Sequence, residues 1–148
     1  MKKWTSVTTS LPEKMKSVLI SDKNGKIRKA FINIGGIWII QNTNSIPSLF
    51  YRDESMVLAW MPLPNVYKKH SHEGWILTSK SLPKNDIPVL ISTKNEIFIS
   101  YCRSGNSDMW WLRNSENKDS QKVYLSKQSV IAWMPLPEAF NTSKGDNT

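Results

Sequence analysis

The run Ala-Trp-Met-Pro-Leu-Pro occurs twice in this chain, at Ala59–Pro64 and at Ala132–Pro137. Proline has no N–H to donate to a sheet ladder, so each run predicts that a β-strand ends at its first proline. The Trp and Met before that proline are large apolar side chains that a small sheet can bury. We therefore interpret each run as a structural lock that closes a small module, with a peptide-like docking motif as the alternative. The residues with this structural role are Trp4, Trp60, Pro62, Pro64, Trp75, Trp133, Pro135 and Pro137.

The match between the two halves extends beyond this run. Trp4 aligns with Trp75, and Val18–Ser21 aligns with Val89–Ser92, both at an offset of 71 residues. The offset grows to 73 at the second run, which predicts a two-residue insertion at the turn 104–108. A repeat of this length predicts two copies of one supersecondary unit. We expect a first module at residues 1–67, a linker at 68–74, a second module at 75–140 and a disordered tail at 141–148.

Each module is predicted to be a small antiparallel β meander of about four strands, so the predicted fold class is mainly β with little helix. Apolar, β-branched runs alternate with turn signals such as Asn24-Gly25. No window of about 11 or more residues shows the 3.6-residue period of an amphipathic helix. The expected strands are Val18–Ser21, Lys26–Asn33, Ile37–Gln41 and Met56–Trp60 in the first module, and Val89–Ser92, Glu96–Arg103, Met109–Leu112 and Ser129–Trp133 in the second.

Four elements recur in both copies: an opening Trp, a Leu-Pro, a Val-Leu-Ile and the closing Trp-Met-Pro-Leu-Pro. They are Trp4, Leu11–Glu13, Val18–Ile20 and Trp60–Pro64 in the first copy, and Trp75, Leu82-Pro83, Val89–Ile91 and Trp133–Glu138 in the second. This pattern resembles the phage and prophage family called domain of unknown function 551, here as a tandem copy. Lys84 departs from it where the first copy has Glu13, and so does Asn65 where the second copy has Glu138. The resemblance implies a phage or prophage origin, the cytoplasm of the bacterial host as location, and no assigned catalytic residues.

The sequence shows no catalytic or metal-binding motif. The two histidines, His70 and His72, lie in the expected linker beside lysines that repel cations, and Cys102 is the one cysteine. There is neither a Gly-x-Ser-x-Gly motif nor a glycine-rich phosphate loop. We therefore expect a protein that is not an enzyme, with no cofactor and no metal. No apolar stretch approaches the roughly 20 residues that span a bilayer, so we expect no membrane partner and no secretory signal.

The positive charge is unevenly distributed along the chain. The net charge is +8, with 20 basic and 12 acidic residues. Residues 1–70 carry 11 basic and 4 acidic residues, a net of +7, whereas residues 71–148 carry 9 and 8, a net of +1. The excess therefore belongs to the first module. Surface charge for solubility does not require such an asymmetry, and random drift is the alternative explanation.

The second expected strand shows this contrast at the level of single residues. A gapless alignment sets Lys26 and Arg28 opposite Ile97 and Ile99. Residues two apart share one face of a strand, so this face is predicted to be basic in the first module and apolar in the second. The alternative is a bulge that shifts the register and places Lys26 and Arg28 at an exposed edge.

Trp110 and Trp111 are adjacent, and the 73-residue offset pairs Trp111 with Trp38. Neighbouring residues on a strand point to opposite faces, so one of the two rings is expected to face outward unless the following loop covers it. An exposed Trp beside Arg103 and Arg113 is a platform for a base or a hot spot for a protein. The candidate partner-binding residues are Lys26, Arg28, Lys29, Arg103, Trp110, Trp111 and Arg113.

These observations together predict a non-catalytic, phage-encoded binding protein that acts as a counter-defence or host-modulating factor. Its expected partner is a host defence protein that it blocks, or an anionic nucleotide signal that it sequesters. A nucleic-acid-binding accessory protein is one alternative, with only weak binding expected because no recognition motif is present. A structural virion or assembly component is the other alternative, and self-association is left open.

Overall fold

The computed structural model describes residues 3–41, 49–50, 54–70, 73–102, 109–112, 124–126 and 129–145. The chain divides into two compact units. Unit 1 comprises Met1–Gln41, Pro47–Leu63 and Pro137–Thr148, and unit 2 comprises Asn42–Ile46 and Pro64–Leu136. This division differs from the expected module boundaries, because the end of the chain belongs to unit 1 and the segment after the first Trp-Met-Pro-Leu-Pro run belongs to unit 2.

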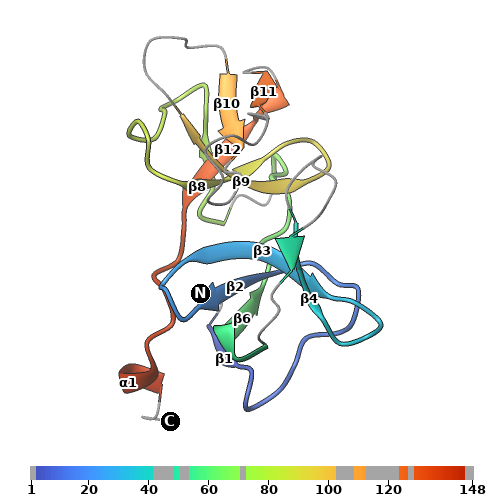
Figure 1. Cartoon of the computed structure of the whole chain (residues 1–148). Helices are drawn as coiled ribbons and strands as arrows, with labels where there is room; N and C mark the ends of the chain where they lie inside the picture. The colour runs from blue at the N-terminus through green and yellow to red at the C-terminus, as the bar shows by residue number, and fades with distance from the viewer. Residues whose placement is uncertain are drawn as a thin grey trace. The chain divides into compact units, whose positions relative to one another are not determined.

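Unit 1 is a six-stranded antiparallel sheet in the order β1-β6-β2-β3-β4-β5. Strands β1, β2, β3, β4 and β6 are labelled in Figure 1. Strands β2, β3 and β4 form the expected meander, whereas β6 returns to pair with β2, which is the strand order of a Greek key. The 3-10 helix η1 (Glu54–Met56) directly precedes β6. The strands are β1 Thr5–Ser6, β2 Val18–Asp22, β3 Ile27–Ile32, β4 Trp38–Ile40, β5 Leu49–Phe50 and β6 Val57–Pro62.

Unit 2 has a second six-stranded antiparallel sheet in the order β11-β10-β9-β8-β12-β7. Starting from its β7 edge, this sheet has the same strand order as unit 1. Its strands are β7 Ile76–Leu77, β8 Val89–Ser92, β9 Ile97–Cys102, β10 Met109–Leu112, β11 Tyr124–Ser126 and β12 Ala132–Pro135. The first proline of each repeated run is the last residue of its strand, Pro62 in β6 and Pro135 in β12.

The chain is therefore mainly β, as predicted. Among the described residues the helices are η1 and the four-residue α1 (Thr142–Gly145). Helix α1 lies in the segment that was expected to be a disordered tail, and so corrects that expectation for residues 142–145.

Each sheet packs its apolar residues into a core of its own. The central strand β2 is buried along its whole length because it has a neighbour on each side. In the edge-proximal strand β6 buried and less buried residues alternate, as the two-residue period of a strand requires. The core is formed in unit 1 by Val18, Ile20, Ala30, Ile32, Trp38 and Val57, and in unit 2 by Val89, Ile91, Phe98, Trp110 and Val130.

Trp60 and Trp133, predicted to be buried in equivalent positions, occupy equivalent positions but are only partly buried. Trp60 Nε1 donates a hydrogen bond to the Ser10 carbonyl at 2.9 Å, and Trp133 Nε1 donates to the Ser81 carbonyl at 2.9 Å. Each ring packs on the core of its unit and fixes the segment that leads into the central strand.

The β2–β3 hairpin is one residue longer than its counterpart in unit 2. Ser21 pairs with Ile27 in unit 1, and Ser92 pairs with Ile97 in unit 2. Five residues therefore join the paired positions in unit 1 and four in unit 2. The pairing of β2 with β6 also shifts register between Ser21 and Asp22. The gapless alignment is thus wrong for the second strand of the meander.

The corrected register changes which residues correspond between the units: Lys26 to Glu96, Arg28 to Phe98 and Lys29 to Ile99. The observed pairing agrees with the alternative prediction that the register of this strand is shifted. The exposed edge in that alternative is not observed, because β3 lies between β2 and β4.

Candidate functional site

The predicted basic residues of unit 1 lie around the β2–β3 hairpin. The chain reverses at Asn24-Gly25, where Gly25 has a φ of 73°. A side chain is strained at such a φ, so glycine is favoured there. The Gly25 N–H donates to the Asp22 carbonyl at 3.0 Å, and the Asp22 N–H donates to the Lys26 carbonyl at 3.0 Å.

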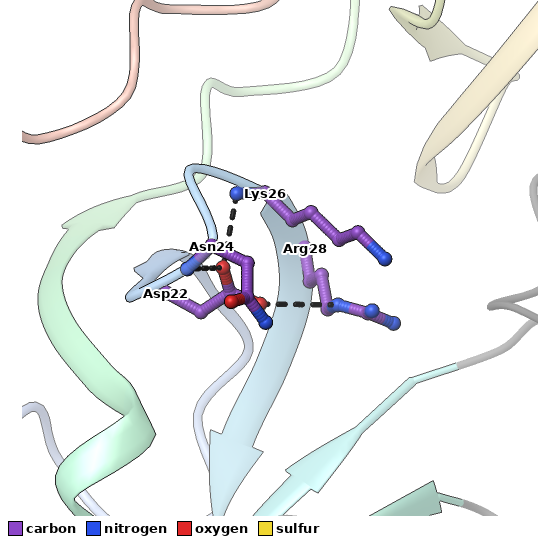
Figure 2. A network of polar contacts seen from close by, with 4 residues as sticks. All are labelled: Asp22, Asn24, Lys26 and Arg28. Atoms are coloured by element: carbon purple, nitrogen blue, oxygen red, sulfur yellow. Dashed lines mark hydrogen bonds and ion pairs between the residues drawn. The ribbon is translucent and has the colours of Figure 1, made fainter.

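The Asp22 carboxylate organises this hairpin (Figure 2). Its Oδ1 accepts the N–H of Asn24 at 2.9 Å and the N–H of Lys26 at 3.0 Å. Its Oδ2 lies 3.7 Å from Arg28 Nε, and the side chains of Arg28 and Asp22 are 13% and 2% exposed. A buried carboxylate is stable only with donors and an opposite charge around it, and here the hairpin supplies both.

The hairpin places two cationic side chains next to one another. In Figure 2 the side chains of Lys26, which directly precedes β3, and of Arg28 in β3 run in the same direction away from the hairpin. Arg28 Nε faces Asp22 Oδ2 in this pair. A guanidinium beside an ammonium is a combination of groups that proteins use to bind phosphate or carboxylate.

Lys29, the third predicted basic residue of unit 1, points to the opposite face of β3. It is 7% exposed, and it pairs in register with Leu19. The structure therefore brings Lys26 and Arg28 together and separates Lys29 from them.

The equivalent hairpin of unit 2 has neutral side chains at the positions of Asp22 and Arg28. Thr93 stands in the place of Asp22, and its Oγ1 accepts the N–H of Asn95 at 3.4 Å and that of Glu96 at 3.1 Å. Phe98, in the place of Arg28, is 8% exposed and belongs to the core. Part of the charge difference between the two halves is thus located in one hairpin.

The register places Trp110 in the core, which corrects two expectations. Ile32 pairs with Trp38 in unit 1, and Cys102 pairs with Trp110 in unit 2. Trp38 therefore corresponds to Trp110 and not to Trp111. The two rings are 3% and 2% exposed, so Trp110 offers no platform to a partner. The other predicted groups of this unit, the Trp111 side chain, Arg103 and Arg113, lie outside the described residues.

A segment near the end of the chain, Pro137–Phe140, closes unit 1. Trp4 Nε1 donates to the Glu138 carbonyl at 2.8 Å, and the Phe140 N–H donates to Ser21 Oγ at 3.0 Å. Ser21 is fully buried in β2. We call Pro137–Phe140 a strap, and the pair of Trp4 and Ser21 its strap site.

Unit 2 has a strap of the same kind, Pro64–Tyr67, from the middle of the chain. Trp75 Nε1 donates to the Asn65 carbonyl at 3.1 Å, and the Tyr67 N–H donates to Ser92 Oγ at 2.8 Å. Ser92 is fully buried, as Ser21 is. The sequence-based prediction of functional residues included neither Ser21 nor Ser92, and it included neither strap. The signal was present in the repeated Val-Leu-Ile-Ser and in an aromatic residue three positions after the second proline of each run.

Exposed apolar side chains also gather beside the β3–β4 turn. The Met15 N–H donates to the Ile32 carbonyl at 2.7 Å, and Lys14 Nζ donates to the Ile34 carbonyl at 3.1 Å. Met15, Ile34 and Ile37 are 56%, 76% and 41% exposed. Small groups of exposed apolar side chains are common on soluble proteins, so this group alone indicates no partner.

Within the parts of the chain that the structure describes, no group of three or more His, Cys, Asp or Glu residues could hold a metal ion. His70 is exposed, and His72 lies outside those parts. Across the same residues, no helix is both long and apolar enough to cross a membrane.

Residues 74–140 match the family model described as "Protein of unknown function (DUF551)". These residues carry a DUF551 domain. The family expected from the motifs is thereby confirmed for residues 74–140. The DUF551 domain begins beside Trp75 and ends at Phe140, so it includes both the Trp of one strap site and the strap of the other. No curated protein and no solved structure matches the chain.

Besides the strap contacts, unit 1 and the DUF551 domain each contain hydrogen bonds at equivalent positions. The Val7 N–H donates to the Leu58 carbonyl at 3.0 Å, and the Thr78 N–H of the DUF551 domain donates to the Ile131 carbonyl at 3.1 Å. Met15 and Asp86, at equivalent positions, have φ values of 65° and 61°. The two sheets therefore agree in strand order and in details of their loops.

Proposed function

We propose that unit 1 is a second, diverged DUF551 module, and that the chain is a tandem copy of phage or prophage origin. Three observations support this proposal: the common strand order, the identical Trp-Met-Pro-Leu-Pro runs, and the equivalent hydrogen bonds of the two straps. The straps are the strongest support, because they join equivalent residues through equivalent atoms.

We further propose that the tandem is a non-catalytic binding protein whose unit 1 holds an anionic group between Lys26 and Arg28. The observation that carries this proposal is the Asp22–Arg28 ion pair, at the position where unit 2 has Thr93 and the core residue Phe98. A partly buried ion pair seldom stabilises a fold more than apolar packing does. Stability alone therefore gives no reason for the exchange, whereas anion binding does.

The class of ligand that suits this pair is a phosphate-bearing small molecule, such as a nucleotide. A guanidinium held in one orientation binds phosphate oxygens in a fork, and a neighbouring ammonium adds a point charge. In the cytoplasm of a bacterial host, such a protein acts as a counter-defence or host-modulating factor by sequestering an anionic nucleotide signal. Blocking a host defence protein through an acidic patch on that protein is the other form of the same proposal.

The binding proposal is tested by calorimetric titration of nucleotides into the parent chain and two variants. Lys26→Ala removes one of the two cations, and we expect the affinity to fall about tenfold, because a charge-assisted hydrogen bond contributes roughly 1.5–3 kcal/mol. Lys94→Ala is the matched control, since Lys94 is an exposed lysine in the equivalent hairpin of unit 2. Equal affinities of the two variants for every nucleotide that binds the parent would exclude the site.

The partner itself is identified by passing host lysate over the immobilised parent chain and the Lys26→Ala variant. Mass spectrometry of the retained small molecules and proteins then separates a nucleotide from a host protein. Retention of nucleic acid would favour a nucleic-acid-binding accessory protein, which the net charge of +8 supports. Retention of phage structural proteins would favour a virion or assembly component.

A further inference from the structure

We propose that each strap site is a peptide-binding site for the strap sequence, and that the partner it fits is a second copy of this chain. The proposal rests on the hydrogen bonds and burial at the two strap sites, and it is independent of any ligand at Lys26 and Arg28.

The two straps present the same chemistry to their sites. Their sequences are Pro64-Asn65-Val66-Tyr67 and Pro137-Glu138-Ala139-Phe140, so proline comes first and an aromatic residue last in both. In each strap the second residue offers its carbonyl to a Trp Nε1, and the aromatic residue offers its N–H to a buried Ser Oγ. Each site thus binds its strap through one main-chain carbonyl and one main-chain N–H, which lie two residues apart in the strap.

The sites are also equivalent to one another. The strap that follows one module binds the site of the other module, and this holds in both directions. A site that accepts Glu138 and Phe140 therefore differs little from a site that accepts Asn65 and Tyr67. We infer that each site recognises the strap pattern rather than one particular segment of the chain.

A strap from a second chain can make the same contacts as the strap of its own chain. The contacts are identical in both cases, so the choice depends on effective concentration and not on a new interface. A short strap held by a few hydrogen bonds also opens at a lower free energy than the sheet unfolds. Exchange of straps between two chains is therefore an inexpensive route to a dimer.

The first test uses the parent chain at rising concentration. We expect native mass spectrometry and light scattering to show a dimer whose fraction rises with concentration. Mixing of isotope-labelled and unlabelled chains is expected to give mixed dimers. Phe140→Pro removes the N–H that Ser21 accepts and so weakens the strap contact that holds two exchanged chains together, and we expect the dimer fraction of this variant to fall by about tenfold or more. Glu138→Gln is the matched control, because it changes an exposed side chain and keeps the carbonyl that Trp4 binds.

The second test uses a labelled peptide of residues 134–145. We expect this peptide to bind the full-length Phe140→Pro variant at least about tenfold more tightly than the parent, because the variant's own strap no longer occupies the site. A peptide with the same Phe140→Pro change is expected not to bind.

A third test uses the parent chain alone with excess peptide, so it does not depend on the folding of a variant. Excess peptide is expected to accelerate hydrogen exchange at the Phe140 amide, because it displaces the strap. Absence of mixed dimers at every concentration, or an unchanged Phe140 amide at saturating peptide, would overturn the proposal. Neither result bears on nucleotide binding at Lys26, so this proposal and the proposed function fail separately.

Discussion

Asp22 is a residue at which the chemistry of the two units differs. In unit 1 its carboxylate accepts two main-chain N–H groups and faces Arg28, whereas in unit 2 a threonine hydroxyl accepts the equivalent pair. The hydroxyl satisfies the turn at no cost in buried charge. The carboxylate satisfies the turn and also lies 3.7 Å from Arg28 Nε, at ion-pair distance.

We expect Asp22→Ala to destabilise unit 1 by about 2–4 kcal/mol, because it leaves a partly buried Arg28 without its carboxylate and removes the acceptor of two N–H groups. Thr93→Ala removes the equivalent acceptor in unit 2, and we expect a loss of only about 1 kcal/mol. Urea unfolding followed by residue-resolved hydrogen exchange measures each unit separately. Equal losses in the two variants would contradict the role of the ion pair.

Lys26 and Arg28 are expected to differ in their effects on stability, although both were predicted to be exposed. Lys26→Ala is expected to change the free energy of unfolding by less than about 0.5 kcal/mol. Arg28→Ala leaves the 2% exposed Asp22 without its ion pair, and we expect a loss of about 2–3 kcal/mol. Thermal unfolding of the two variants checks this order, and the reverse order would place Asp22 in solvent.

At the scale of the elements, Trp60 and Trp133 connect each sheet to the segment that precedes its central strand. Replacement of either by Phe keeps most of the packing and removes the Nε1 donor, so we expect a loss of about 1 kcal/mol. Replacement by Ala is expected to cost about 2–3 kcal/mol, less than a fully buried Trp, because both rings are partly exposed. Denaturant titration of the four variants measures these losses. Unequal losses at the two positions would show that the units do not pack them alike.

The strands could be predicted to within a few residues, because β-branched apolar runs and proline stops are local signals. Expected Val89–Ser92 and Met109–Leu112 coincide with β8 and β10. Strands β1, β5, β7 and β11 were missed, because two or three residues are too few to show a period.

The register within the sheets could not be predicted in the same way. A hairpin can gain one residue without changing its apolar pattern, yet one residue of slip turns every side chain to the other face. That slip is why Arg28 was aligned with Ile99 and why Trp110 was expected to compete with Trp111 for the surface. The straps were missed because their partners lie 119 and 25 residues away from Phe140 and Tyr67.

At the scale of the whole molecule, unit 1 is completed by a segment that follows unit 2 in the sequence. We expect removal of residues 137–148 to destabilise unit 1 by about 1–3 kcal/mol, because it leaves the buried Ser21 hydroxyl and Trp4 Nε1 without their partners. Unit 2 is expected to change by less than about 0.5 kcal/mol, although it adjoins the removed segment in sequence. Hydrogen exchange of amides in β2 and β8 compares the two units. A loss confined to unit 2 would mean that the straps do not act as the hydrogen bonds indicate.

The net charge of +8 leads to a prediction for the whole chain, because phosphate attraction sums over all its cations. Random duplex and single-stranded DNA are expected to bind only weakly, and the affinity is expected to fall by about tenfold or more between 50 and 200 mM salt. Two of the predicted partner-binding residues add nothing to the pair of Lys26 and Arg28, since Trp110 is in the core of unit 2 and Lys29 lies on the face of β3 opposite Arg28. Fluorescence anisotropy of labelled DNA across a salt series measures both quantities, with Lys26→Ala as a variant that removes a single cation. Submicromolar binding to random sequence at physiological salt would contradict a localised anion site and favour a surface that follows the nucleic-acid backbone.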